Sequence, residues 1–468
     1  MAGTFVIGEE KVRPGAYFNI SRNDSNTSAD IVNGVTAVVF KADFGPLLDV
    51  RKLNADTDYG SIYGTGLTTD AIKEAVAGGA KEIIACRVGH GGTNASIDLN
   101  DKDGEAAVKI SAMYPGDKKF AVTIREKITD SLAKECIIYT GTKEFVKFAF
   151  PAGEGEAAAV AEGLAKSESF AVSLVSGKEK AELANISQET FTKGENPEVT
   201  TEDYSDAFAA IEPYVFNTIC VDTEDTVIHL LLAAFLNRIF EAGSLAQGVV
   251  AEKYTVDLDK RIEHALGFND EKMHYVLNAR VNEEGKEIDG YQTAARIAGM
   301  IGACASNSSL THTVINGFTD ILERLTNTQI VDAEKKGCLV LSVSSKNQVW
   351  IDNAINTLTV FTEDKDEGWR KIRRVKTRFE LIRRVNDITD DLVGKVDNDS
   401  NGRKTIVSQI QGVGKSMVEE GKLVSCTVTE STVYTADGDS AWFNIDVIDK
   451  DSAEHLYMMF RFQFSTNE

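Results

Sequence analysis

The five residues Gly412-Val413-Gly414-Lys415-Ser416 come closest to a catalytic signature in this chain. A phosphate-binding P-loop has the form G-x-x-x-x-G-K-[ST], and its backbone amides cradle the phosphates. That form would require a glycine at position 409, where the chain has Gln409. No obvious buried strand precedes the segment, so an anion nest is not expected. The sequence therefore predicts a loop or a helix turn here.

Other residue types that could do chemistry are spaced in ways that do not favour a site. Gly64 and Gly66 lack the third glycine of a dinucleotide fingerprint, since position 69 is Thr69. The histidines show no spacing that would set metal ligands on one face, and no nucleophile elbow or Cys/His context supports covalent catalysis. We predict no enzyme, no cofactor and no metal. The histidines are His90, His229, His264, His274, His312 and His455.

One segment has a charge opposite to that of the whole chain. Residues 369–384, WRKIRRVKTRFELIRR, hold eight basic residues and one acid, Glu380. At helical spacing, Ile372, Val375 and Phe379 share one face, and arginines crowd the other, which predicts charges that point outward together. Three interpretations stay open: a solvated face balanced by nearby acids, a docking surface for an acidic protein, which we favour, and a nucleic-acid site.

The bulk composition limits the classes of partner. The chain has 468 residues, a formal net charge of -22 and 43% hydrophobic residues, so it can bury cores and divides into roughly three domains of about 150 residues. Nucleic acid and anionic membrane would both be repelled by the whole molecule. The six cysteines stand singly, which predicts reduced core thiols. The N-terminus does not resemble a signal peptide, and the apolar run 227–235 is too short to span a bilayer, which predicts a buried helix.

The order of periodic segments predicts an α/β domain interrupted by a β-rich insertion. Strands are expected at 32–40, 81–88, 338–343 and 348–351, and helices at 70–77, 227–240, 294–305 and 369–389. The stretch 294–305 is rich in Gly and Ala, whose small side chains permit close helix approach. Short alternating strands at 106–112, 120–125 and 135–140 indicate the insertion, and 424–434 with 442–448 a hairpin. The predicted fold class is α/β and α+β multidomain: a central domain (23–92 and 196–345), the insertion (93–195), a C-terminal α+β domain (346–455), and arms at 1–22 and 456–468.

Both ends of the chain read as isolated strand-like arms. Pro14 and Gly15 form a stiff corner before the β-favouring run 16–20. At the other end, phenylalanines at 460, 462 and 464 alternate with polar residues, the period of a strand with one buried face. Each arm either pairs within its own subunit or joins a sheet edge of another copy by β-augmentation.

Several motifs, taken in this order along one chain, resemble contractile tail sheath proteins of bacteriophages and phage-tail-like particles. They are KVRPGAYFNI (11–20), YPG (114–116), SLTHTV (309–314), INTLTVFT (355–362), WRKIRRVKTRFELI (369–382), VGKVDNDSNGRK (393–404) and AEHLYMMFRF (453–462). The likeness covers most of the chain and is weakest over 93–195.

The resemblance implies a structural role without catalysis. Such subunits stack as rings around an inner tube and contract to drive it through a target envelope. It implies a helical homopolymer linked by arm exchange, an inner tail tube partner, baseplate and tail terminator partners, no nucleic acid, no membrane insertion, and assembly in the bacterial cytoplasm. The implied arm residues are Val12, Pro14, Gly15, Tyr17, Ile20, Leu456, Met458, Phe460, Phe462 and Phe464. The implied inner-tube contacts are Arg370, Arg373, Arg374, Arg378 and Arg384.

Two other functions compete with this one. A nucleotide-driven motor would use the region around Lys415, and a binding module for an acidic partner would form a discrete oligomer rather than an open polymer.

Overall fold

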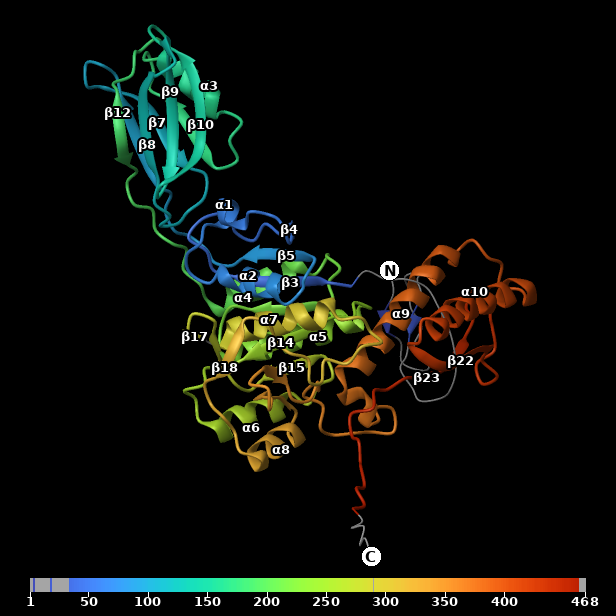
Figure 1. The fold of residues 1–468 in the computed structure, drawn as a ribbon. Coiled ribbons are helices and arrows are strands. Elements are labelled where there is room, and N and C mark those ends of the chain that lie inside the picture. Colours follow the sequence, from blue (N-terminus) through green and yellow to red (C-terminus); the bar gives the residue numbers. More distant parts are fainter. Residues whose placement is uncertain (1–2, 5–16, 19–32, 289, 463–468) are drawn as a thin grey trace, which may run out of the picture.

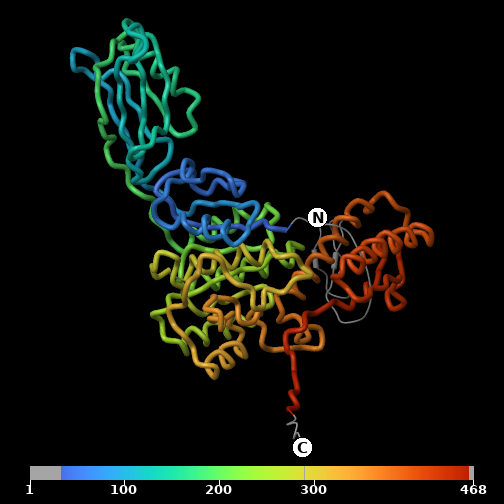
Figure 2. The backbone as a smooth tube through the Cα atoms, in the orientation of Figure 1, coloured from blue at the N-terminus to red at the C-terminus, as the bar shows by residue number. Residues whose placement is uncertain are grey.

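The computed structural model describes residues 3–4, 17–18, 33–288 and 290–462. A central α/β body carries a β-rich domain that projects from one end and a helical unit with a β-hairpin at its side (Figure 1). The backbone trace shows the same arrangement, with the C-terminal segment leaving the body as a tail (Figure 2). The predicted mixed α/β multidomain fold class is confirmed.

The central body is built on a seven-stranded sheet of order β19-β15-β14-β13-β3-β5-β4. All neighbours are parallel except β4, which pairs antiparallel with β5. Both faces are covered, so strands such as VTAVVF are buried at every residue and almost entirely apolar. The strands are β3 (Val35–Phe40), β4 (Arg51–Asn54), β5 (Glu82–Arg87), β13 (Thr218–Val221), β14 (Gln247–Ala251), β15 (Met273–Val276) and β19 (Cys338–Leu339).

Helices cover both faces of this sheet. Alternate residues of β3 point to opposite faces: Val38 joins the core with α2 (Asp70–Ala77) and α7 (Gly290–Ala303), and Val39 joins the other core. The helices of that second face are α4 (Thr201–Ile211), α5 (Thr226–Glu241), α6 (Leu258–Phe268) and α8 (Asn327–Lys335). The body is thus a three-layer α/β sandwich.

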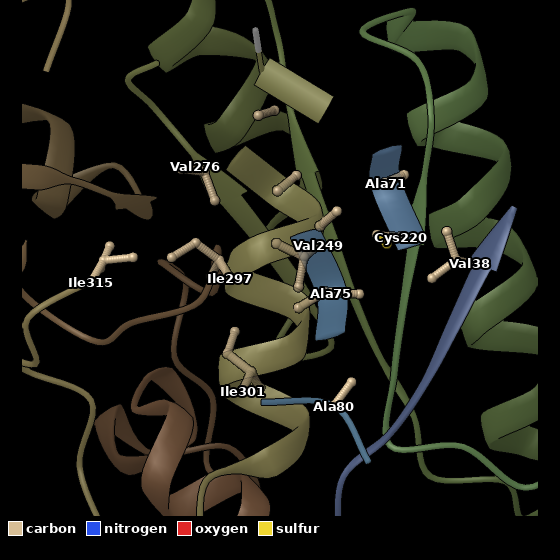
Figure 3. Close-up of a cluster of buried hydrophobic side chains, with 14 of the residues drawn as sticks. Val38, Ala71, Ala75, Ala80, Cys220, Val249, Val276, Ile297, Ile301 and Ile315 are labelled. Atoms are coloured by element: carbon tan, nitrogen blue, oxygen red, sulfur yellow. The ribbon is translucent and has the colours of Figure 1, made fainter. Parts of the chain in front are cut away.

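The first core depends on small side chains in α7. Ile297 and Ile301 of α7 belong to the same buried cluster as Ala75 of α2 and Val249 of the sheet (Figure 3). The two helices approach so closely that a Cβ on Gly299 would lie 2.0 Å from the backbone oxygen of Ala75. The predicted role of the Gly/Ala-rich stretch in close helix approach is confirmed.

Shorter elements complete the body. They are helix α1 (Tyr59–Tyr63), a small sheet of β16 (Arg280–Asn282), β17 (Glu287–Ile288) and β18 (Phe318–Ile321), and a ribbon of β20 (Leu341–Val343) and β21 (Val349–Ile351). Thr357 hydrogen-bonds to the backbone of Asp270 and Met273. Residues 349–358 therefore pack on the central body, beyond the boundary at 345 that the sequence suggested.

The inserted domain is a sandwich of two antiparallel sheets around an aromatic core. Phe120 contacts the rings of Phe145, Phe170 and Phe191 inside the domain and of Phe44 in the central body. The sheet orders are β10-β9-β8-β12 and β11-β7-β6. The elements are β6 (Ser96–Asn100), β7 (Ala106–Ala112), β8 (Ala121–Lys127), β9 (Asp130–Thr140), β10 (Lys143–Pro151), α3 (Glu156–Leu164), β11 (Phe170–Leu174) and β12 (Ile186–Thr190).

The junction of this domain with the body is held by two buried cations. The guanidinium of Arg87 donates to the carbonyl oxygens of Ala42, Gly45 and Pro115. The ammonium of Lys118 lies 4.9 Å from the ring centre of Phe44, a cation–π contact. Burial lowers the pKa of Lys118 to about 8.

The C-terminal unit packs two long helices against a hairpin, with its own small apolar core. It comprises η1 (Glu367–Arg370), α9 (Ile372–Leu392), α10 (Ser400–Glu419), β22 (Leu423–Glu430) and β23 (Phe443–Asp449). At the other end of the chain, β1 (Gly3–Thr4) pairs in parallel with β2 (Tyr17–Phe18).

The helix contact at Gly299 yields a stability prediction. Gly299→Ala should lower the free energy of unfolding by about 1–3 kcal/mol, because the new methyl group meets backbone that cannot move aside cheaply. Gly412→Ala in α10 is the matched control, since a Cβ there meets nothing within 4 Å. It should stabilise the chain by about 0.5–1 kcal/mol. Denaturant unfolding measures both, and equal effects would contradict the close-approach account.

Candidate assembly surface

Helix α9 holds most of the basic segment, and its charges are not directed outward together as the sequence predicted. Arg384 is only 1% exposed. The helix lies between the central body, α10 and the β22–β23 hairpin, and acids from distant segments meet its cations. The outward-facing cluster is therefore a wrong prediction, because the partners were too far away in sequence to be recognised.

Two arginines of α9 share one carboxylate. Arg374 Nη2 lies 2.7 Å from Asp449 Oδ1, and Arg378 Nε lies 3.0 Å from Asp449 Oδ2. Burial alone would raise the pKa of Asp449, but the hydrogen bond from Arg374 and the charge of Arg378 hold this pKa below its usual range. Asp449 is the last residue of β23, so this contact fixes the hairpin to α9.

A second ionic cluster joins α9 to the end of α10. Arg384 lies 2.8 Å from Glu420 and 2.5 Å from Glu380, and Lys422 lies 2.7 Å from Glu380. Burial would raise the pKa of Glu420, but hydrogen bonds from Arg384 and Lys422 outweigh it and lower this pKa to about 2. Arg384 and Glu380 are buried, Glu420 is partly exposed, and the two cations neutralise the two acids, which is the condition for burying such charges.

Other cations of α9 satisfy main-chain carbonyls of the central body. The ammonium of Lys376 donates to the oxygens of Ile301 and Cys304 at the end of α7, where helix carbonyls lack intrahelical partners. Arg383 donates to the oxygen of Phe216 at 3.2 Å. Burial lowers the pKa of Lys376 to about 8 and that of Arg383 to about 10. Side chains of α9 thus satisfy free carbonyl groups of the central domain and fix the helix to it.

Four of the five arginines predicted to contact an inner tube are therefore engaged within the chain. Arg370 donates to the oxygen of Glu334, and Arg374, Arg378 and Arg384 have the carboxylate partners given above. Arg373 is half-buried and forms no ion pair with any residue that the structure describes.

The predicted N-terminal arm is described only in part. Tyr17 lies in β2, which pairs with β1 of the same chain. Val12, Pro14, Gly15 and Ile20 lie outside the described residues, as does Phe464 at the other end.

The C-terminal arm leaves the body with its apolar side chains exposed. Leu456 is 70% exposed, Phe460 73% and Phe462 88%, and Met458 is exposed as well. The segment projects away from every other part of the molecule (Figures 1 and 2). Residues 450–462 have no regular secondary structure, although the sequence predicted a strand from 456. A strand requires a hydrogen-bonded neighbour, and the described part of the chain supplies none.

The β22–β23 hairpin is a sheet of two strands alone. Its inner face carries Leu423, Cys426 and Val428, whereas Val424 and Thr427 face solvent. Within the described residues, no further strand pairs with either outer edge of this hairpin. Such an edge is a template for an added strand.

The motifs that resembled catalytic signatures are accounted for structurally. Gly412 to Ser416 lie within α10, which confirms the prediction of a helix turn. Within the ranges that the structure describes, no three His, Cys, Asp or Glu residues gather as a metal site, and no helix is long and apolar enough to cross a membrane. The six cysteines are free thiols.

Sequence reasoning missed one polar network at the centre of the sheet. At the adjacent ends of β3 and β13, Lys41 Nζ lies 3.0 Å from Asp222, and the hydroxyl of Tyr204 donates to Asp222 at 2.6 Å. Burial and the charge of Asp222 raise the pKa of Tyr204. Open α/β sheets bind ligands at such a position, but here the side chains satisfy one another. Their signal was the position directly after two buried strands.

The sequence is similar to one protein family and to two Bacillus subtilis proteins. The family described as "Phage tail sheath protein central domain" matches residues 197–357. Phage-like element PBSX protein XkdK of Bacillus subtilis (strain 168) is 24% identical and covers 97% of this chain and 98% of its own length. Uncharacterized protein YqbK of the same strain is also 24% identical, over 87% of this chain and 84% of its own length.

Solved structures share the fold over nearly the whole chain. The sheath tail protein of Desulfitobacterium hafniense is 20% identical, with a TM-score of 0.70 over 93% of this chain and 100% of that one. The contracted helical sheath of the anti-feeding prophage is 10% identical, with a TM-score of 0.53 over 98% and 99%. A chain in the six-fold symmetrised baseplate structure of the same particle has 11% identity and a TM-score of 0.53, over 97% and 100%.

The cluster around Arg384 yields a pH prediction. Because the pKa of Glu420 is lowered in the folded chain, its contribution is complete above its unfolded pKa of about 4.5 and is lost as the pH falls toward about 2. Glu420→Gln should lower the free energy of unfolding by about 1–3 kcal/mol at neutral pH. The deficit should shrink as the pH falls through this window.

Denaturant unfolding at several pH values measures this effect. The control is Glu419→Gln, which changes the exposed neighbouring acid. A deficit for Glu420→Gln that is the same at all pH values would contradict the ionic account.

Proposed function

We propose that this chain, which over residues 197–357 belongs to the phage tail sheath family, is the sheath subunit of a contractile injection machine. It polymerises as stacked rings around an inner tube and contracts to drive that tube through a target envelope. The observation that carries the proposal is the C-terminal arm: large apolar side chains that follow one another along residues 456–462 are all exposed, outside a body with well-formed apolar cores.

The C-terminal arm could pair as an added strand with the β22–β23 hairpin. Residues 456–462 offer a backbone outside regular secondary structure and large exposed apolar side chains. The β22–β23 hairpin lies over a hydrophobic core and, among the described strands, has no further neighbour. Each backbone hydrogen bond formed on joining would contribute about 1 kcal/mol. Burial of Phe460 and Phe462 would add about 1.5–3 kcal/mol each. We propose that the arm of one copy extends the hairpin of another.

Contraction in this scheme draws on energy stored in the assembly rather than on nucleotide hydrolysis. The P-loop-like residues are part of α10, where helical backbone amides are already engaged. The family and the solved neighbours are sheath proteins, and we propose that this chain too is structural and not an enzyme.

The partners follow from the same scheme. Similar chains occur in a helical sheath and in a baseplate structure, which supports self-polymerisation and baseplate association for this chain. An inner tube protein, a tail terminator and assembly in the bacterial cytoplasm complete the proposal. The particle itself would be a virion or a released tail-like particle.

We propose Arg373 as the inner-tube contact among the arginines of α9. Arg373 is the candidate on α9 whose charge is not already paired with a described acid. Arg374 and Arg378 have side chains that are 20% and 16% exposed, and both are paired with Asp449. They could contribute to a tube contact while keeping these ion pairs. Exposed ion pairs contribute about 0–1 kcal/mol each, so such a contact could be released step by step.

Removal of the arm tests polymerisation. A chain ending at His455 should remain a folded monomer with an unchanged melting temperature, because residues 456–462 are exposed. It should form no tubular polymers in electron micrographs under conditions in which the full chain does. Polymers of normal length from the shortened chain would refute arm exchange at this end.

Substitution at Arg373 tests the tube contact. Arg373→Glu should leave sheath-only polymers intact but reduce co-assembly with the tube protein. Exposed Lys404 on α10 is the matched site for a Lys404→Glu control. Normal co-assembly by Arg373→Glu, measured by co-sedimentation, would remove this residue from the interface.

A further inference from the structure

The C-terminal arm is joined to the body by a short acidic stem. We define the stem as residues 449–454, between the end of β23 and the first residue of the exposed arm. Asp449, Asp451 and Glu454 are its three acids. All three carboxylates are bound, whereas every described residue after Glu454 is exposed. Glu454 is thus the last described point at which the chain is held before the arm begins.

Glu454 is held by groups from two separate parts of the molecule. Its Oε1 accepts hydrogen bonds from Ser309 Oγ at 2.9 Å and Thr311 Oγ1 at 3.2 Å, both in the central body. Its Oε2 lies 3.0 Å from Lys371 Nζ. The side chain is 11% exposed. Burial alone would raise the pKa of Glu454, but the hydrogen bonds from Lys371 and Ser309 hold it below its usual range.

The stem runs along one basic face at the start of α9. Lys371 Nζ also lies 2.7 Å from Asp451, and Arg374 and Arg378 bind Asp449. Positions 371, 374 and 378 are separated by three and four residues, so they fall on the same side of the helix. Lys371 therefore pairs with Asp451 and Glu454, whereas Arg374 and Arg378 share Asp449. This pairing neutralises much of the charge that the sequence had suggested for an external partner.

The same helix is tied to the central sheet on its other side. Lys376 caps the last carbonyls of α7, and the hydroxyl of Thr377 donates to the oxygen of Ser306 at 2.7 Å. Helix α7 in turn packs directly on the sheet. A continuous path of polar contacts thus leads from the stem through α9 to the core of the central domain.

We propose that the pairing of the stem with Lys371, Arg374, Arg378 and Ser309 is the anchor that holds the C-terminal arm and transmits its pull to the central domain. This rests on the proposed sheath function, in which the arm is bound to a neighbouring copy. Without the anchor, tension on the arm would peel the hairpin from α9 instead of moving the body. Lys371 and Ser309 are positioning residues in this scheme, because each binds the stem and not the arm itself.

Limited trypsin digestion of the unpolymerised full chain tests the anchor. Lys450 lies inside the stem, and Arg461 lies in the exposed arm, so cleavage after Arg461 is an internal reference. Lys371→Gln removes the cation without altering either cleavage site. We expect cleavage after Lys450, relative to Arg461, to become about tenfold faster, the factor for loss of a charged hydrogen bond. Ser309→Ala should show a smaller increase, and exposed Lys404→Gln none. Wild-type ratios for both Lys371→Gln and Ser309→Ala would overturn the anchor.

The second measurement is the resistance of polymers to guanidinium chloride. If the anchor carries the pull, Lys371→Gln polymers should dissociate at a lower concentration than those of the wild type and of Lys404→Gln. Polymers as resistant as wild type, formed by a variant whose stem is released, would overturn the transmission of pull. If the unaltered chain forms no polymers, the proposed sheath function fails, whereas the trypsin result still decides whether the stem is anchored.

Discussion

The neutralisation of a strongly basic segment, residues 369–384, inside a strongly acidic chain is the constraint on which the C-terminal half of this structure depends. Charges can be buried only where partners and hydrogen bonds replace water. Helix α9 meets that condition with three different sets of groups: carboxylates of the stem, carboxylates near the end of α10, and carbonyl oxygens of the central body. Each set belongs to a different part of the molecule, so satisfying the charges of α9 also assembles the parts around it.

The contrast between this satisfied body and the exposed arm explains the proposed function. The cores are dense and the described polar clusters are paired, yet Leu456, Phe460 and Phe462 have no cover within the described chain. Exposed apolar side chains on an extended backbone gain most by joining an open sheet edge. Among the described residues, no further strand pairs with the hairpin, and the arm is not folded back onto it. A link between copies follows naturally, and the stem supplies a fixed point from which that link can act.

Much of the fold could be predicted from local pattern. Helix α2 occupies the predicted residues 70–77, and strand β7 the predicted 106–112, because periodicity and turn residues are local signals. The small residues of α7 correctly indicated a close helix contact. The orientation of α9 could not be predicted, because Asp449 and Glu420 lie dozens of residues from their arginines. The period-two pattern near Phe460 predicted a strand that the described chain cannot form alone. The network of Lys41, Tyr204 and Asp222 escaped notice because its members meet only once the sheet has formed.

The most direct test of the account is amide hydrogen exchange of residues 456–462, measured before and after assembly. In the unpolymerised chain these amides should exchange at nearly the rate of an unstructured peptide, because the described structure gives them no hydrogen-bonded strand partner. In polymers they should become strongly protected, together with the outer edges of the β22–β23 hairpin. Rapid exchange that persists in well-formed polymers would show that this arm does not join the copies, and would contradict the account.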